Sequence, residues 1–274
     1  MPRIKPACFF RIFRGILVFV LLFALWRVFI ADRFVIPTRS MEPTLEAGDR
    51  ILVNKTIVGA RIYKDYRFHN GMELKCWRTR GLRDLQRGDI VVFNFPRNGD
   101  GSSDGISFKI NYVFAKRCIG IPGDSISAVN GYWRNSNYSG VLGVEECQAR
   151  LSVIPIELLS PEVNNVIRPS GSNWTVKDFG PIYVPRKGDM IEINDTTEAL
   201  YGVLFKYEKV DSAAVRHIFI HNYYYMAGDN VCDSGDSRYW GFVPDEYVVG
   251  VVKAVLFNRD RETGKRNFKR FRLL

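Results

Sequence analysis

The stretch Gly88-Asp89-Ile90-Val91-Val92-Phe93 carries the pattern that decides the fold, a turn dipeptide followed by a short apolar run. Gly-Asp precedes similar runs at residues 50–53 and 190–193. Turn residues before β-branched runs are typical of turns that enter strands. The intervals between the three differ, so the pattern is turn chemistry and not an internal repeat. We therefore expect three strands, each beginning at a Gly-Asp turn.

The rest of the chain adds strand candidates at residues 112–121, 217–227 and 247–257. Helical signals are weak beyond the N-terminus and aromatic residues make up 14% of the 274-residue chain, so we predict a mainly β protein with an antiparallel β-sheet core. Residues 130–215 are less patterned and contain five prolines, and we expect an inserted, β-rich subdomain there. We expect a mobile loop at the Gly/Ser/Asp-rich segment Asn98–Gly105.

The N-terminal segment is apolar from Gly15 to Ile30, broken only by Arg27. Its uninterrupted part, up to Trp26, has the length of a signal-peptide core and is short for a membrane span. Cleavage after Ala31 would place a phenylalanine at −3, where a small residue is needed, and Arg27 can snorkel to the interface. We predict a retained transmembrane anchor over residues 15–31 with a cytoplasmic N-terminus, 1–14; a cleaved signal peptide is the alternative.

The net charge of +10 is concentrated at the two ends of the chain. Basic residues next to a membrane span attract anionic lipid headgroups, so membrane lipid is a predicted partner. The basic tail, residues 258–274, is expected to be disordered or to lie on lipid. No zinc module, helix-turn-helix or RNP strand is recognisable, and we expect no nucleic-acid partner. The basic residues in question are Arg3, Lys5, Arg11, Arg14, Arg259, Arg261, Lys265, Arg266, Lys269, Arg270 and Arg272.

The histidines and cysteines do not form a recognisable metal motif, and no metal or cofactor is expected. His217 and His221 are spaced to share one face of a strand; a metal pair is conceivable, but two sheet-surface histidines are the simpler interpretation. Cys8 falls at the membrane boundary. The other four cysteines face a compartment that permits disulfides, and sequence alone does not give their pairing: Cys76, Cys118, Cys147 and Cys232.

Two residues are candidates for chemistry near the membrane. Ser40 lies nine residues after Ala31, at most about 30 Å of extended chain. A serine nucleophile needs a base, and no Gly-x-Ser-x-Gly elbow accompanies this one. Lys116 lies in a predicted strand on the face of Phe114 and Cys118. If that face is buried, the pKa of Lys116 is lowered, which suits base catalysis. The alternative is a lysine on an edge strand, exposed to water.

A third motif occupies residues 226–241, where Gly228-Asp229-Asn230 is followed by Ser234-x-Asp236-Ser237-Arg238-x-Trp240-Gly241. Taken alone it is an acidic turn without the terminal glutamate of an EF-hand loop. Together with Ser40-Met41-x-Pro43-Thr44-Leu45-x-x-Gly48-Asp49, Leu85–Val91 and Lys116-Arg117-x-Ile119-Gly120-x-Pro122-Gly123-Asp124, it resembles the ordered boxes of type I signal peptidases, the membrane-bound Ser/Lys proteases. The boxes span residues 36–250, and the segment 130–215 carries little of the resemblance.

The resemblance implies a role for each matched residue. Ser40 is expected to be the nucleophile and Lys116 its general base. Ser234 is expected to orient the lysine, with Asp236 and Arg238 as a supporting ion pair. The hydroxyl of Thr38, at a position where the family often has serine, is expected to help stabilise the oxyanion, although threonine restricts χ1. Arg39 replaces a commonly small residue, which alters access beside the nucleophile.

The implied function is an endopeptidase that removes signal peptides from secretory preproteins after small residues at −3 and −1, through an acyl-enzyme. It would sit in the cytoplasmic (inner) membrane with a catalytic core outside, formed by residues 32–129 and 216–257. Two alternatives remain. One is a self-cleaving Ser/Lys protease of the LexA type, which shares the fold; the other is an anchored β-rich binding module without activity.

Overall fold

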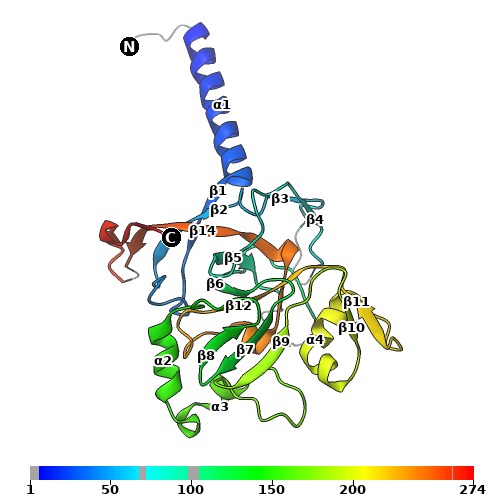
Figure 1. Cartoon of the computed structure of the whole chain (residues 1–274). Coiled ribbons are helices and arrows are strands. Elements are labelled where there is room, and N and C mark those ends of the chain that lie inside the picture. The colour runs from blue at the N-terminus through cyan, green and yellow to red at the C-terminus, as the bar shows by residue number, and fades with distance from the viewer. Residues whose placement is uncertain (1–5, 68–71, 98–104, 261) are drawn as a thin grey trace.

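The computed structural model describes residues 6–67, 72–97, 105–260 and 262–274 (Figure 1). Helix α1 (Pro6–Phe29) projects away from a β-rich body. Its apolar part, Phe10–Phe29, has a mean hydropathy of 2.2 and is not buried against the rest of the chain. Twenty residues at about 1.5 Å each give roughly the 30 Å of a bilayer core. The helix is long enough to span because it begins well before Gly15, where we had placed the start of the anchor.

The body is built on one antiparallel nine-stranded sheet with the order β1-β2-β14-β5-β6-β12-β13. Strands β15 and β16 pair with the long strand β14 in addition. The mainly β, antiparallel prediction is therefore confirmed. The strands of this sheet are β1 (Ala31–Val35), β2 (Asp49–Asn54), β5 (Ile90–Asn94), β6 (Val113–Gly120), β12 (Tyr223–Ala227), β13 (Val243–Pro244), β14 (Val248–Arg259), β15 (Arg266–Asn267) and β16 (Arg272–Leu273).

Smaller elements surround this sheet. A three-stranded sheet has the order β8-β7-β9, and two hairpins pair β3 with β4 and β10 with β11. Their bounds are β3 (Arg61–Tyr63), β4 (Cys76–Arg78), β7 (Ser125–Val129), β8 (Tyr132–Asn135), β9 (Phe179–Tyr183), β10 (Met190–Glu192) and β11 (Arg216–Ile218). The helices are α2 (Glu145–Val153), α3 (Pro161–Asn164), α4 (Asp195–Tyr207) and α5 (Ser237–Trp240), with 3₁₀ turns η1 (Ile156–Leu158), η2 (Asp245–Tyr247) and η3 (Phe268–Arg270).

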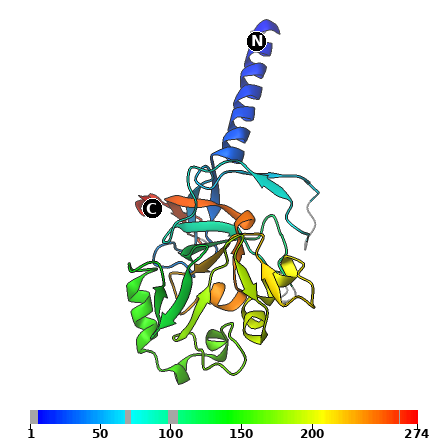
Figure 2. The same cartoon turned by 45° about the vertical axis from the view of Figure 1, so that its right-hand side comes forward.

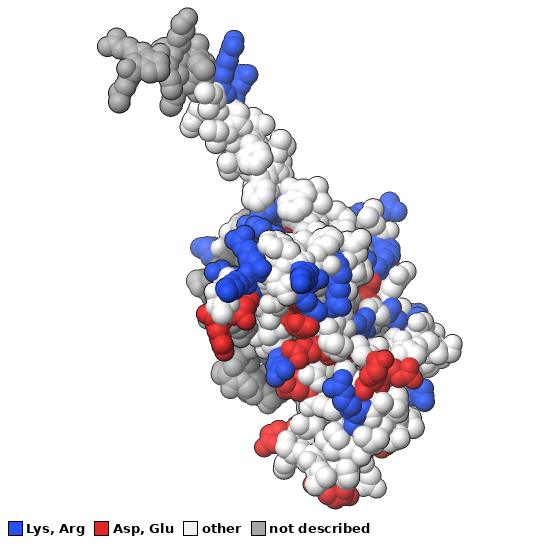
Figure 3. Space-filling model, turned by 90° about the vertical axis from the view of Figure 1, so that its left-hand side faces the viewer, with Lys and Arg blue, Asp and Glu red and all other residues white. Residues whose placement is uncertain are grey.

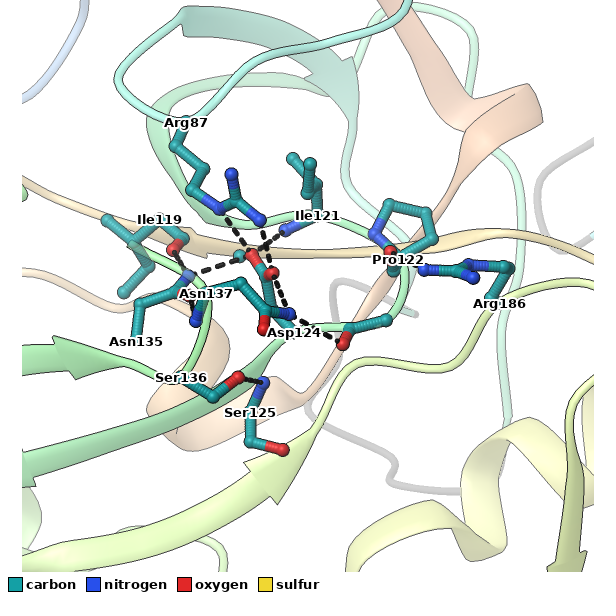
Figure 4. A network of polar contacts seen from close by, with 12 residues as sticks. Arg87, Ile119, Ile121, Pro122, Asp124, Ser125, Asn135, Ser136, Asn137 and Arg186 are labelled. Carbon is teal, nitrogen blue, oxygen red and sulfur yellow. Dashed lines mark hydrogen bonds and ion pairs between the residues drawn. The ribbon is translucent and has the colours of Figure 1, made fainter. Parts of the chain in front are cut away.

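Four of the Gly-Asp dipeptides form one recurring turn, at Asp49, Asp89, Asp124 and Asp189. In each, the aspartate N–H donates to the carbonyl three residues back, and its carboxylate accepts from that residue's N–H. The preceding glycine has φ near +90°, which glycine adopts without strain. At Asp124 the carboxylate also accepts from Arg87, Asn135 and Asn137 (Figure 4). The turn thus enters a strand and fixes its start.

Two sequence predictions differ from the structure. The predicted strand over residues 217–227 is two strands, β11 and β12, which pair with different partners. The helices α2 and α4 were not predicted. Helix α4 begins at a reciprocal cap in which Asn194 accepts from the Thr197 N–H, and α2 has no side-chain cap. The loop prediction at Asn98–Gly105 falls almost wholly outside the described residues.

The region 130–215 packs onto the central sheet. Its Trp133, Phe179 and Phe205 share one buried cluster with Ile119 of β6 and Tyr225 of β12. Strands β8, β9 and β10 lie in this region together with α2 and α4. The region 130–215 therefore shares a buried cluster with β6 and β12 of the central sheet.

The basic tail is ordered where the structure describes it, so the expectation of disorder was wrong. The tail turns back on β14, pairing Arg266 with Arg259 and Arg272 with Val255. Figures 1 and 2 show this tail at one end of β14, on the side of the body that carries α1. Backbone pairing supplies the order that the polar composition of the tail did not suggest.

Candidate active site

Ser40 lies in the turn-rich segment that connects β1 to β2. Its backbone carbonyl accepts from the Asn230 N–H at 3.1 Å, and the Asn230 side chain donates to the Arg39 carbonyl at 3.3 Å. Its Oγ lies 3.3 Å from Thr38 Oγ1. The Arg39 side chain is 73% exposed, pairs with Glu42 and lines the same cavity as the two hydroxyls. The serine hydroxyl is therefore held on a partly exposed loop with a second hydroxyl beside it.

Lys116 projects from β6, where it pairs in register with Val91 of β5. Only 2% of the residue is exposed. Its Nζ lies 6.0 Å from the Phe114 ring centroid, which agrees with the two sharing a face. Burial lowers the pKa of Lys116 from its ordinary 10.5 to about 8, against the opposing field of Asp236. The edge-strand alternative is thereby excluded, because a lysine in water would be exposed.

A buried polar group orients the lysine. Nζ of Lys116 donates to Ser234 Oγ at 3.0 Å. Behind Ser234, the Asp236 carboxylate accepts two bonds of 2.8 Å from the Arg238 guanidinium and one of 3.0 Å from the Gly228 N–H. Burial would raise the pKa of Asp236, but Arg238 outweighs it and lowers the pKa. Both partners are almost fully buried, and the carboxylate stays charged because it is fully paired.

Ser40 and Lys116 line the same cavity, of about 470 Å³. Its walls are mostly apolar, formed by Ile36, Val113 and Ala115 among others. No hydrogen bond joins Ser40 Oγ to Lys116 Nζ within the described part of the chain. Catalytic hydrogen bonds are often long before substrate binds, so the shared cavity is the relevant geometry.

Three features of the site were not predicted from sequence. Gly228 leaves room for the orienting serine, because a Cβ there would lie 2.1 Å from Ser234 Oγ and 2.5 Å from the Ser40 carbonyl oxygen. Asp229 forms a two-bond ion pair with Arg117 at 2.6 and 2.7 Å. In the basic tail, Arg272 donates to the backbone carbonyl of Thr44. The motif Gly228-Asp229-Asn230 is the sequence signal for the room beside Ser234. No local pattern predicts the hydrogen bond from Arg272 to Thr44.

The tail holds the serine loop at a second point. Arg270 pairs with Glu46 at 2.8 Å and with Asp49 at 2.7 Å. Asp49 is fully buried and belongs to the Gly-Asp turn at the end of the loop that carries Ser40. The loop is therefore fixed from two sides, by Asn230 and by the tail.

The histidines do not share a strand face as predicted. His217 lies on β11 and contacts Glu208 at 2.5 Å, whereas His221 lies beyond that strand near Glu246. His69 lies outside the described residues. Across residues 6–67, 72–97, 105–260 and 262–274 no group of side chains suited to a metal ion occurs. Cys76, Cys118, Cys147 and Cys232 are all free thiols.

A serine and a buried lysine on one cavity of a β-sheet body have the makeup of a peptidase. The family described as "Signal peptidase, peptidase S26" matches residues 9–134 and 184–257, and the chain belongs to this family. The unmatched segment, 135–183, lies within the predicted insertion.

Curated relatives agree with this assignment. A "Signal peptidase I" of Buchnera aphidicola subsp. Schizaphis graminum is 30% identical, over 93% of this chain and 77% of the relative. The "Signal peptidase I" of Aquifex aeolicus is 29% identical over 85% of this chain and 78% of the relative. That of Pseudomonas aeruginosa is 27% identical, over 84% and 66%. The family match covers most of helix α1 as well as much of the β-sheet body.

Proposed function

We propose that this chain is a membrane-anchored endopeptidase that removes signal peptides from secretory preproteins with a Ser40/Lys116 dyad. The main support for this proposal is that Ser40 and the buried Lys116 line one cavity and that burial lowers the pKa of the lysine to about 8. The family supplies the substrate class. The mostly apolar lining of the cavity beside Ser40 is compatible with the small side chains that the family resemblance implies at −3 and −1.

The chemistry requires a neutral lysine. Ser40 Oγ attacks the scissile carbonyl carbon while its proton passes to Lys116 Nζ. The Ser40 N–H and the Thr38 hydroxyl would stabilise the oxyanion. The C–N bond then breaks, the proton moves from Nζ to the leaving amine, and an ester to Ser40 remains. Lys116 next takes a proton from water, and the water oxygen attacks the ester carbonyl carbon. The ester C–O bond breaks, the proton on Nζ passes to Ser40 Oγ, and the signal peptide leaves with a free carboxylate.

Ser234, Asp236 and Arg238 act as positioning residues in this scheme. Ser234 holds Nζ in the cavity and accepts its hydrogen bond. The Asp236–Arg238 pair fixes the loop that carries Ser234, because the same carboxylate bonds to Gly228 and caps α5. Removing one member would leave a buried charge unpaired, which is costly.

Helix α1 would anchor the enzyme in the cytoplasmic membrane. Its length and apolar surface suit a span. Arg11 and Arg14 at its N-terminal end favour a cytoplasmic N-terminus and an external β-sheet body. Ser40, a short distance after the helix, would then face the surface where a translocated preprotein leaves the bilayer.

Cleavage of a preprotein by the full chain in detergent tests the proposal. Ser40→Ala and Lys116→Ala should each abolish product formation while thermal unfolding remains cooperative. Normal processing by either variant would overturn the dyad. The self-cleaving alternative predicts loss of intact enzyme without preprotein cleavage, and the binding-module alternative predicts no cleavage by wild type.

A further inference from the structure

The strand register places an arginine-rich face beside the foot of α1. Arg50 of β2 pairs with Val35 of β1 on one side and with Phe257 of β14 on the other. Directly paired residues lie on one face of a sheet, as do residues two apart along a strand. Arg33 and Arg259 therefore join Arg50 on this face. Arg266 joins them because it pairs directly with Arg259.

These four arginines line one cavity of about 360 Å³ together with Arg27 and Asp32. Asp32 is the single acidic residue of its lining, and it is already paired with Arg27 at 2.8 Å and with Lys55 at 3.5 Å. None of the four has a carboxylate partner within the described part of the chain. Figure 3 shows basic side chains gathered on this side of the molecule, below the helix.

The arrangement is unfavourable without an anion. Like charges directly opposite each other on paired strands destabilise a sheet, and Arg259 and Arg266 stand in that relation. Arg266 instead stacks on the Phe257 ring at 5.5 Å, and Arg259 donates to the Gly264 carbonyl. Both contacts leave other guanidinium N–H groups available to a phosphate, which arginine binds through paired hydrogen bonds.

We propose that this cavity, defined by Arg33, Arg50, Arg259 and Arg266, binds the phosphate of an anionic phospholipid headgroup. The choice of a lipid rests on the proposed insertion of α1 in the membrane. Arg27 belongs to the last turn of that helix and also lines the cavity, so the site is at headgroup depth. The ordered tail would then bind lipid through a defined cavity, and bound lipid would fix the body against the membrane.

Native mass spectrometry of the full chain in uncharged detergent tests this site. Phosphatidylglycerol should bind more tightly than phosphatidylcholine. The double variant Arg50→Gln/Arg266→Gln should weaken phosphatidylglycerol binding at least about tenfold, since each basic residue near a membrane surface contributes measurably. The matched control, Arg134→Gln/Arg216→Gln, removes the same charge from exposed positions on β8 and β11 and should bind like wild type.

Three outcomes would overturn the proposal: equal binding of the two lipids, equal weakening by both double variants, or inorganic phosphate displacing the lipid at micromolar concentration. The last would identify a site for free phosphate. Cleavage of a soluble peptide in lipid-free detergent separates this proposal from the protease proposal. The Arg50→Gln/Arg266→Gln variant should cleave at the wild-type rate, so loss of lipid binding is seen independently of catalysis.

Discussion

The lysine side and the serine side of the site are built in opposite ways. Lys116, Asp236 and Arg238 are each at most 2% exposed and come from a central strand and the α5 cap. Ser40 is partly exposed on a loop between the first two strands, and Thr38 beside it is exposed. The lysine is held by side chains close to it, whereas the serine loop is held by Asn230 and by the C-terminal tail.

The difference agrees with the roles proposed for the two groups. A general base near neutral pH needs burial, because water would return the lysine pKa to its ordinary value. A nucleophile that attacks a polypeptide must be reachable, so it cannot be enclosed. Substitutions near Lys116 should therefore change both the pKa of Lys116 and the cleavage rate. Substitutions near Ser40 should change the cleavage rate alone.

The largest effect is expected for Lys116→Met. Without a base, cleavage should fall by at least about 10⁴-fold, yet the variant should be more stable at pH 7. A lysine pKa lowered from 10.5 to about 8 costs about 3 kcal/mol of folding free energy below pH 8. The unfolded state binds more protons between these values, so wild-type stability should rise with pH across that window. Urea unfolding at pH 7 and pH 9 checks this; a destabilised variant would mean that the contacts of the lysine outweigh its burial cost.

Thr38→Val should lower kcat by about 10²–10³-fold, because it removes one proposed oxyanion donor at nearly constant volume. Thr38→Ser retains the hydroxyl and should keep most of the activity. Steady-state kinetics on a signal-peptide substrate give the comparison. Equal activity of valine and serine variants would remove Thr38 from the mechanism.

Gly228→Ala should reduce the rate roughly a hundredfold by displacing Ser234, since a shift of about 1 Å in a catalytic group has effects of that size. Gly235→Ala is the control, because a Cβ there meets no atom within 4 Å. The rates of the two variants are compared in one assay. Equal rates would show that the backbone adjusts around Gly228.

The pH profile of kcat/KM should rise about tenfold per unit up to about pH 8 and then level off. The rise reports loss of the proton from Lys116 in the free enzyme. Serine-side variants such as Thr38→Ser should keep the same inflection. A profile that is flat between pH 6 and pH 9 would contradict a lysine base.

The smallest effect is expected for Arg272→Gln, which removes the hydrogen bond from the tail to the Thr44 carbonyl. Loss of a charged hydrogen bond of about 1.5 kcal/mol should lower activity roughly tenfold by loosening the serine loop. Lys269→Gln, an exposed change in the same tail, is the control. If both variants retain full activity, the tail does not position the nucleophile.

Sequence reasoning reached the strands that begin at Gly-Asp turns, because turn chemistry and β-branched runs are local signals. It also brought Ser40 and Lys116 forward as a pair through their motifs. It missed α4, whose cap uses Asn194 and Thr197 rather than a charged pair. It misjudged the tail, because the tail is polar in composition and its order comes from backbone pairing of β15 and β16 with β14.

The sequence by itself determined the apolar N-terminal helix, the mainly β architecture and the identity of the residues proposed for catalysis. The helix and the β architecture follow from composition and short-range patterns, whereas the catalytic residues follow from the resemblance of the ordered motifs to a known family. The tertiary structure decided that Lys116 is buried, that Ser234 faces it, and that Arg270 and Arg272 reach the serine loop. Burial and long-range hydrogen bonds are set by how strands far apart in the chain pair. A lysine therefore acquires its lowered pKa only when the sheet is assembled around it.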